Sequence, residues 1–173
     1  MHTPISVMAY LLAACTFPIK NDRIDTAAEE VITDFGEIDV IDIDTCDADN
    51  LITFTEVRVG GETVETLAPG QNAQVWAVVG NQCKNEILFA TETGCLVEGW
   101  SVNLSSGGSA SGAFICDPDA VDRTLRSGQT LQRMVAPLND LPLGIYTGTV
   151  NFSLVSSGGE IVTEAFTVSV SGI

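Results

Sequence analysis

Few side chains in this sequence could perform acid–base or nucleophilic chemistry. Its one histidine, His2, lies at the start of the chain, so Ser-His-Asp, Cys-His and histidine–metal schemes lack their central residue. No GxSxG, GxGxxG or P-loop motif occurs. Carboxylates are abundant, but they fall in predicted strand faces and loops, with no sign of a cleft that would raise one pKa. We therefore predict no catalytic residues and a protein that is not an enzyme.

One group of carboxylates has spacing that invites a metal hypothesis. Calcium takes 6–8 oxygen ligands, commonly from flexible loops. A loop beginning at Asp42 or Asp44 lacks the glycine and glutamate that an EF-hand needs at its sixth and twelfth positions. Two interpretations stay open, a weak calcium site or the solvated face of an acidic strand, and no other cofactor is expected. The calcium candidates are Asp42, Asp44, Asp47 and Asp49.

The cysteines favour disulfides over a metal or redox site. None of the five forms a CxxC pair, and no histidine lies in the body of the chain. Apart from Cys15, four cysteines allow three connectivities. We expect Cys83–Cys95, because both lie at the ends of sequentially adjacent strands, which leaves Cys46–Cys116. Two disulfides indicate an oxidising compartment. The alternative is reduced, buried thiols, as in a virion part assembled in a cytoplasm.

The amino-acid composition limits the kinds of partner that this protein could bind. The 173 residues carry 7 Lys plus Arg and 23 Asp plus Glu, a net charge of −16, so neither a phosphate backbone nor an anionic membrane surface meets a basic face. Yet 45% of the residues are hydrophobic, which excludes a disordered acidic chain and is enough for a core. The length fits one domain with a short appendage.

The first twenty residues form that appendage, an apolar N-terminal arm. No Lys, Arg, Asp or Glu precedes Lys20, and residues 5–19 are too few for a confident membrane-spanning helix but long enough for the core of a signal peptide. We interpret residues 1–20 as a signal or anchor, or as an assembly segment. The apolar side chains expected to act in assembly are Ile5, Val7, Met8, Leu11, Leu12 and Phe17.

Two short motifs in this arm resemble known families. Leu12-Ala13-Ala14-Cys15 resembles a bacterial lipobox, which would imply a lipid on Cys15 and membrane anchoring through the N-terminus. Residues 11–14, followed by Pro18, are similar to part of the type IV pilin helix, which packs in a filament core. The third interpretation is a plain N-terminal strand or helix packed on its own domain.

Residues 21–46 are expected to connect the arm to the body. Thr26 and Glu29 fit a capping box, and Ala28, Val31, Ile32 and Phe35 recur at helical spacing before Gly36, which predicts a short α-helix over about 26–35. An acidic, strand-like run follows over residues 37–44.

The body, residues 47–173, alternates short β-runs with turn residues. Gly60-Gly61 predicts a hairpin and Pro69-Gly70 a turn, while residues 105–112 are interpreted as a loop or flexible crossover. Such a series, without helical periodicity between the runs, predicts an all-β fold, an antiparallel Ig-like β-sandwich. Trp76 is expected in its core. Strands are predicted within 52–59, 63–67, 74–79, 87–89, 96–102, 131–135, 145–155 and 161–170.

Two segments of the body resemble extracellular Ig-like modules. Leu67-Ala68-Pro69-Gly70-Gln71, with the run from Val75 to Asn81, is similar to the opening of CARDB-type adhesion modules. Residues 141–150, LPLGIYTGTV, resemble the penultimate strand of those modules and of several fimbrial sandwiches. The resemblance covers about residues 50–171 and implies a surface-type sandwich without specifying a ligand.

Together these features predict a non-catalytic structural subunit of a surface assembly of the pilus or filament type. Its partners would be copies of itself or a larger assembly, joined by the apolar arm and by sheet edges. The alternatives are a lipid-anchored or secreted Ig-like adhesion or binding module, and a virion decoration or tail protein. The expected location is extracellular, at a cell surface, or on a virion.

Overall fold

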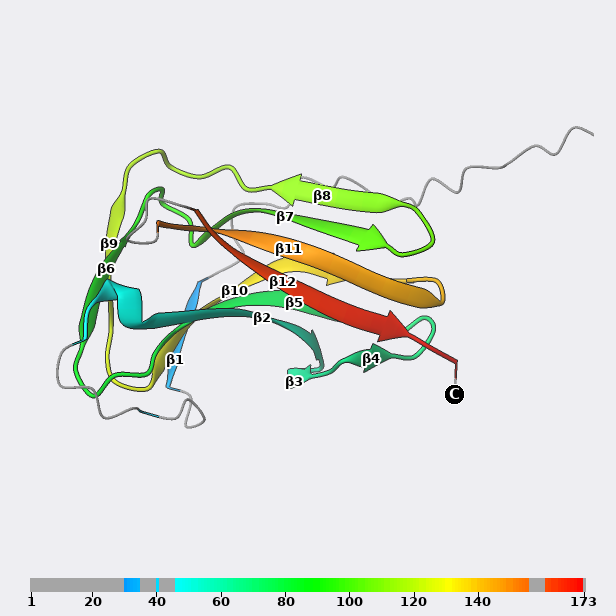
Figure 1. The fold of residues 1–173 in the computed structure, drawn as a ribbon, viewed down its shortest axis with the longest axis horizontal. Helices are drawn as coiled ribbons and strands as arrows, with labels where there is room; N and C mark the ends of the chain where they lie inside the picture. Colours follow the sequence, from blue (N-terminus) through cyan, green and yellow to red (C-terminus); the bar gives the residue numbers. More distant parts are fainter. Residues whose placement is uncertain (1–29, 35–39, 41–45, 156–160, 173) are drawn as a thin grey trace, which may run out of the picture.

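The computed structural model describes residues 30–34, 40, 46–155 and 161–172, and their structure is almost entirely strand (Figure 1). The one helical turn in this part of the chain is a 3-10 turn, η1 (Ala48–Asn50). The strands are β1 (Val31–Asp34), β2 (Leu51–Val59), β3 (Glu62–Thr63), β4 (Thr66–Leu67), β5 (Ala73–Asn81), β6 (Ile87–Thr91), β7 (Val97–Leu104), β8 (Ser109–Ala113), β9 (Val121–Leu125), β10 (Gln129–Leu138), β11 (Gly144–Val155) and β12 (Ile161–Val170).

Two five-stranded sheets make up the sandwich. The first sheet has the order β1-β10-β5-β2-β3, and the second has the order β4-β12-β11-β7-β8. Strands β6 and β9 pair separately as a small sheet at one end (Figure 1). Every pairing among these strands is antiparallel except that of β4 with β12. The predicted fold class, an antiparallel Ig-like β-sandwich, is therefore confirmed.

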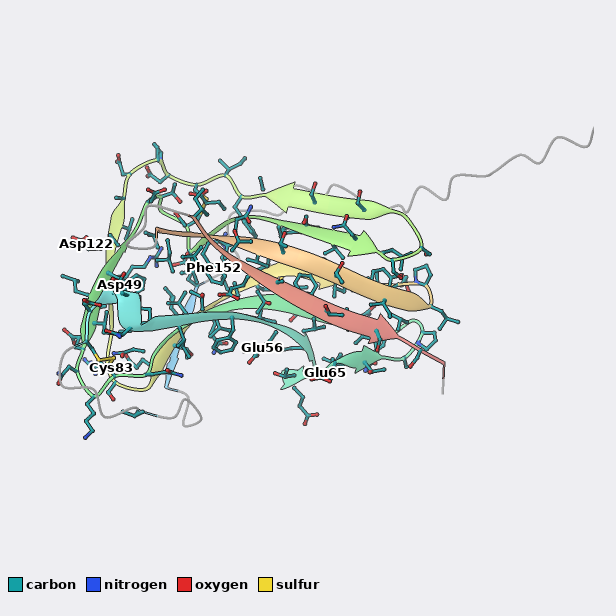
Figure 2. The ribbon with its side chains drawn as sticks, in the orientation of Figure 1. Asp49, Glu56, Glu65, Cys83, Asp122 and Phe152 are labelled. Carbon is teal, nitrogen blue, oxygen red and sulfur yellow. A yellow bond between two sulfur atoms is a disulfide. The ribbon has the colours of Figure 1, made fainter. Side chains whose placement is uncertain are left out.

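The period-2 alternation of side chains places one face of each sheet in the core. In β5, Ala73, Val75 and Ala77 are buried in the core cluster, whereas Gln74 between the first two is exposed and Trp76 is part-exposed. Phe152 of β11 is fully buried between the two sheets (Figure 2). Side chains also join the layers directly, because Thr53 Oγ1 on β2 donates to Glu164 Oε1 on β12 at 2.5 Å.

The two turns predicted from glycine and proline are present in the structure. Gly60 and Gly61 link β2 to β3 with φ of +61° and +95°, left-handed values that glycine adopts without strain. The predicted turn at Pro69-Gly70 is also present, closed by the bond from Gln71 N to Ala68 O. Tyr146 donates from its hydroxyl to Pro142 O at 2.8 Å, in the manner of the tyrosine corner of immunoglobulin-type sandwiches.

The helix predicted over residues 26–35 is wrong where the structure describes it. Residues 31–34 are strand β1, which pairs with β10 from Val31↔Gln132 to Asp34↔Gln129. Val31, Ile32 and Thr33 are three consecutive β-branched residues, a composition that favours a strand. Their backbone groups form hydrogen bonds with β10, and this distant partner cannot be inferred from the local helical periodicity. The remainder of that predicted helix lies outside the described residues.

Two segments in which no strand was predicted also contain strands. Residues 105–112 hold a tight turn and most of β8, which pairs with β7 from Asn103↔Ser109 to Gly99↔Ala113. The polar stretch 117–128 contains β9, which pairs with β6. Serine, glycine and charged residues have low strand preference, so pairing with a neighbouring strand decides these two cases. Within the described part of the chain, no helix is long and apolar enough to span a membrane.

Candidate functional site

Glu30, the first described residue, contacts the body of the protein through its side chain. Oε1 of Glu30 accepts from Leu96 N at 2.9 Å and from Arg133 NH1 at 3.2 Å, while Oε2 accepts from Arg123 NH1. Because Arg123 lies on β9 and Arg133 on β10, one carboxylate joins the small sheet to the first sheet. We call this group the Glu30 anchor.

Both arginines of the Glu30 anchor are held by further contacts. Arg123 donates to Thr91 Oγ1 at 3.2 Å and to Gly94 O at 3.1 Å. Arg133 is 4% exposed, and its Cζ lies 4.3 Å from the centroid of the Phe114 ring, while its Nε has no acceptor among the described residues. A buried guanidinium needs a counter-charge, so Glu30 has a defined electrostatic task at this end of the sandwich.

The disulfides lie at the same end of the molecule but pair differently from the prediction. The structure joins Cys46 to Cys83 and Cys95 to Cys116, with Cα atoms 6.2 and 5.5 Å apart. The expected pairs Cys83–Cys95 and Cys46–Cys116 are wrong, because adjacency along the chain does not place these side chains opposite each other. All four candidate cysteines are nevertheless bonded, which is typical of an extracellular or secreted protein.

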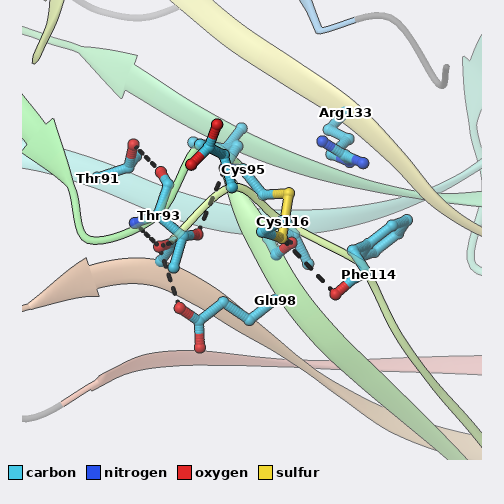
Figure 3. The surroundings of a disulfide bond; sticks show 12 residues. Thr91, Thr93, Cys95, Glu98, Phe114, Cys116 and Arg133 are labelled. Carbon is cyan, nitrogen blue, oxygen red and sulfur yellow. Dashed lines mark hydrogen bonds between the residues drawn. A yellow bond between two sulfur atoms is a disulfide. The ribbon is translucent and has the colours of Figure 1, made fainter. Parts of the chain in front are cut away.

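Local hydrogen bonds hold the segments that carry these cysteines. Near Cys95, Ser153 Oγ accepts from Thr93 N at 3.0 Å and donates to Glu98 Oε1 at 3.1 Å, beside the disulfide (Figure 3). Asn81, which is fully buried, accepts from Cys83 N at 2.8 Å and donates to Leu125 O at 2.9 Å. These contacts fix the loops that bring each pair of sulfur atoms together.

The outer face of the first sheet carries a second cluster, which the sequence prediction missed. Arg58 donates to Glu56 Oε2 at 2.6 Å and reaches Gln132 Oε1 at 2.8 Å, so its guanidinium crosses strand β5. On the way, its Cζ lies 5.1 Å from the centroid of the Trp76 ring. Val78 of β5, between Phe54 and Gln132 in the register, is 1% exposed on this face.

Trp76 therefore lies on the outer face and not in the core, which corrects the prediction for that residue. It is part-exposed, and its Nε1 donates to Gln74 Oε1 at 3.2 Å. Trp100 is the tryptophan that packs against the core. The signal for Trp76 was present in the alternation of β5, since Trp76 shares the phase of the polar Gln74.

The edges of the two large sheets are the remaining surface where backbone groups could take a partner. Edge strands β1, β3 and β4 are two to four residues long, and β1 and β3 contain the acidic residues Asp34 and Glu62. β8 is five residues long and contains only serine, alanine and glycine. Edge strands without charge, proline or a bulge are the ones open to strand addition.

The other predicted site residues have varied outcomes. Asp47 and Asp49 belong to the cap of η1, where Asp47 Oδ1 accepts from Asp49 N at 3.0 Å (Figure 2 labels Asp49). Asp42 and Asp44 lie outside the described residues, as do the lipidation candidate and all six arm residues. Among the residues that are described, no three His, Cys, Asp or Glu side chains gather as a metal site. The lipidation candidate and the arm residues that lie outside the described part of the chain are Cys15, Ile5, Val7, Met8, Leu11, Leu12 and Phe17.

Comparisons with known proteins agree with the sandwich only at low similarity. No family model and no curated protein matches the chain. A solution structure of a CARDB domain from Pyrococcus furiosus is 12% identical, covers 70% of this chain and 94% of its own, and has a TM-score of 0.34. A crystal structure of the same domain in complex with di-metal ions is 10% identical, covers 72% and 97%, and has a TM-score of 0.33.

A family 123 glycoside hydrolase from Clostridium perfringens is also similar, with 10% identity and a TM-score of 0.28 over 72% of this chain and 28% of its own. CARDB domains are thus among the solved structures that this chain resembles, whereas nothing supports the lipobox and pilin likenesses, whose residues lie outside the described part of the chain. At these TM-scores the matches carry no functional argument, so the fold class rests on the strand order itself.

Proposed function

We propose that this protein is a non-catalytic structural subunit of a surface assembly of the pilus or filament type. In this role the apolar N-terminal arm of one copy and the sheet edges of the sandwich join it to other copies. The observation that carries the proposal is the Glu30 anchor, in which one residue of the segment that follows the arm contacts both the first sheet and the small β6–β9 sheet. A load that reaches Glu30 would therefore pass into the folded body.

Charge also supports a role in assembly. Residues 1–19 contain no Lys, Arg, Asp or Glu, although the chain as a whole has a net charge of −16. An uncharged apolar segment can be buried against a neighbour without ionic cost, whereas the acidic surface keeps the bodies apart and in solution.

The test is to add charge to the arm without shortening it. The double variant Leu11→Asp/Leu12→Asp should abolish assemblies seen by electron microscopy, because two carboxylates cannot enter an apolar contact unpaired. The matched control, Ser6→Asp/Thr16→Asp, adds the same charge at polar positions and should retain more assembly. Deletion of residues 1–19 should also abolish it. Unchanged polymers after that deletion would reject the proposal.

A second candidate function is a lipid-anchored or secreted binding module, and the Trp76 cluster on the outer face favours it. A part-exposed indole beside Arg58, which is paired with Glu56, offers an apolar surface flanked by charged groups, which is the composition of many recognition sites. Mass spectrometry of the native N-terminus separates the candidates, since a diacylated Cys15 supports the module and an intact Met1 argues against the lipid anchor. The third candidate, a virion protein, predicts free thiols; titration of the denatured native protein would then find five reactive thiols, against one if both disulfides are present.

A further inference from the structure

We propose that the edge of β8 that faces away from β7 pairs antiparallel with the same edge of a second copy of this chain. The inference rests on the proposed function, because it names one of the sheet edges through which the subunits would meet. It identifies the partner as an identical strand, related to the first by a two-fold axis.

The phase of the β7–β8 ladder shows which backbone groups are available. Phe114 N donates to Glu98 O at 2.9 Å, and Leu104 N donates to Gly108 O at 3.0 Å. Hydrogen-bonded pairs alternate in an antiparallel ladder, so Ala110 and Gly112 use their backbone groups toward β7. The N–H and C=O groups of Ser109, Ser111 and Ala113 therefore point away from β7. In the described part of the chain no strand pairs with that side (Figure 1).

The side chains of β8 leave this edge open. Ser109, Ser111 and Ala113 are exposed and small, so another strand can approach without a steric barrier. On the inner side, the Trp100 ring lies across Gly112, where an added Cβ would come within 2.6 Å of the indole Nε1. This contact holds β8 in place on the sheet, so the edge is ordered before any partner binds.

Charge identifies the partner as a second copy of this chain. Residues 99–116, which include β8 and most of β7, contain no Lys, Arg, Asp or Glu. Two chains of net charge −16 repel each other, and they repel least where the contact surface itself is uncharged. A basic partner would gain nothing at this edge and would favour the acidic edge strands β1 and β3 instead.

One register makes full use of the strand. Because the free groups belong to residues 109, 111 and 113, a two-fold axis through Ser111 pairs Ser109 with Ala113 of the second copy and Ser111 with its equivalent. This arrangement joins the two second sheets into one continuous sheet. Five residue pairs with small side chains provide few hydrogen bonds, so the isolated contact is weak and acts together with the arm.

Cross-linking of the full-length chain tests this register. In a Cys15→Ser background, Ser111→Cys should give an intermolecular disulfide several-fold faster than Ser106→Cys, an equally exposed residue in the β7–β8 turn that does not face itself across the axis. The rate for Ser111→Cys should increase with NaCl, because salt screens the repulsion between acidic copies. Equal rates for the two variants, or a rate that falls with salt, would overturn the inference.

A backbone substitution tests the hydrogen bonding. Ser111→Pro removes one free-edge N–H without touching the ladder to β7, so the monomer should fold while the concentration-dependent exchange protection of the Ser109 and Ala113 amides disappears. Ser111→Ala keeps the N–H and should retain that protection. If wild-type amides show no such protection, the β8 contact is absent. Failure of the arm variants to change assembly would instead reject the proposed function, so the two failures are distinguishable.

Discussion

At the scale of single residues, the Glu30 anchor is the contact with the largest predicted effect on stability. The Glu30 side chain is 19% exposed and that of Arg133 is 5% exposed, so the ion pair is largely shielded from water. Removing one member of a buried pair leaves the other charge without compensation, which costs more than the pair contributes on its own.

We predict that Glu30→Gln lowers the free energy of unfolding by about 2–3 kcal/mol, a value reduced from the fully buried case because Glu30 is partly exposed. Urea denaturation followed by tryptophan fluorescence measures the change. Glu62→Gln, on the exposed edge strand β3, is the matched control and should shift stability by less than about 0.5 kcal/mol. A stability equal to that of the wild type would show that the arginines do not need this carboxylate.

Tyr146 gives the protein a predictable sensitivity to alkali. Burial raises the pKa of the Tyr146 hydroxyl above its ordinary value of 10.0, and that hydroxyl donates to Pro142 O. Above pH 10 the unfolded chain therefore holds fewer protons at this group than the folded protein does, so stability falls as pH rises through the folded pKa. Tyr146→Phe should lose about 1 kcal/mol near pH 7 but show a smaller decline between pH 9 and 11 in urea titrations. Identical alkaline slopes for the two proteins would contradict this.

At the scale of elements, some strands are encoded by their own residues and were easy to predict, whereas others depend on the strand with which they pair and were missed. β5, β11 and β12 carry their own apolar alternation, so sequence alone located them. β1 and β8 do not carry such a pattern. β1 depends on pairing with β10, which is distant in the sequence, and β8 depends on pairing with β7 because its own serine, alanine and glycine residues do not favour a strand. The Glu30 anchor was missed for the same reason, although an arginine within the apolar strand β10 was a visible signal.

The two disulfides were predicted as a pair of bonds but with the wrong connectivity. Cys46 precedes η1 and Cys83 follows β5, and these ends meet only after β2 has paired with β5. Spacing along the chain cannot reveal that meeting. The observed loops of 37 and 21 residues together close at an entropic cost similar to that of the predicted loops, which are 12 residues (95 − 83) and 70 residues (116 − 46).

Tryptic mapping without reduction should distinguish the two connectivities. Cleavage after the lysines and arginines yields peptides 24–58, 59–84 and 85–123. The structure predicts that the first two are linked to each other and that 85–123 contains an internal bridge, whereas Cys83–Cys95 with Cys46–Cys116 would join all three. Removal of the Cys95–Cys116 bond by the double substitution Cys95→Ser/Cys116→Ser should then lower stability by about 3 kcal/mol in the chain-entropy model.

At the scale of the whole molecule, acidity is the dominant physical property. With 23 acidic and 7 basic side chains, like charges crowd the folded surface and oppose its compactness. Salt shortens the range of this repulsion from about 30 Å at 0.01 M to about 3 Å at 1 M.

We predict that the urea midpoint rises as NaCl is increased from about 0.01 M to about 1 M, the range over which screening becomes nearly complete. Potassium chloride should act equally, since the effect is one of screening and not of a specific ion. A midpoint that falls with salt would mean that the ion pairs of Arg58, Arg123 and Arg133 outweigh the general repulsion.

The position of Glu30 also means that the N-terminal arm can be removed without loss of the Glu30 anchor. Lys20 and Arg23, the first basic residues, both precede Glu30. A trypsin-like protease that cuts after either residue would release the apolar N-terminal arm and leave the ion pairs of Glu30 with Arg123 and Arg133 intact. Under the proposed function, a single cut would therefore separate the folded body from the assembly without unfolding it.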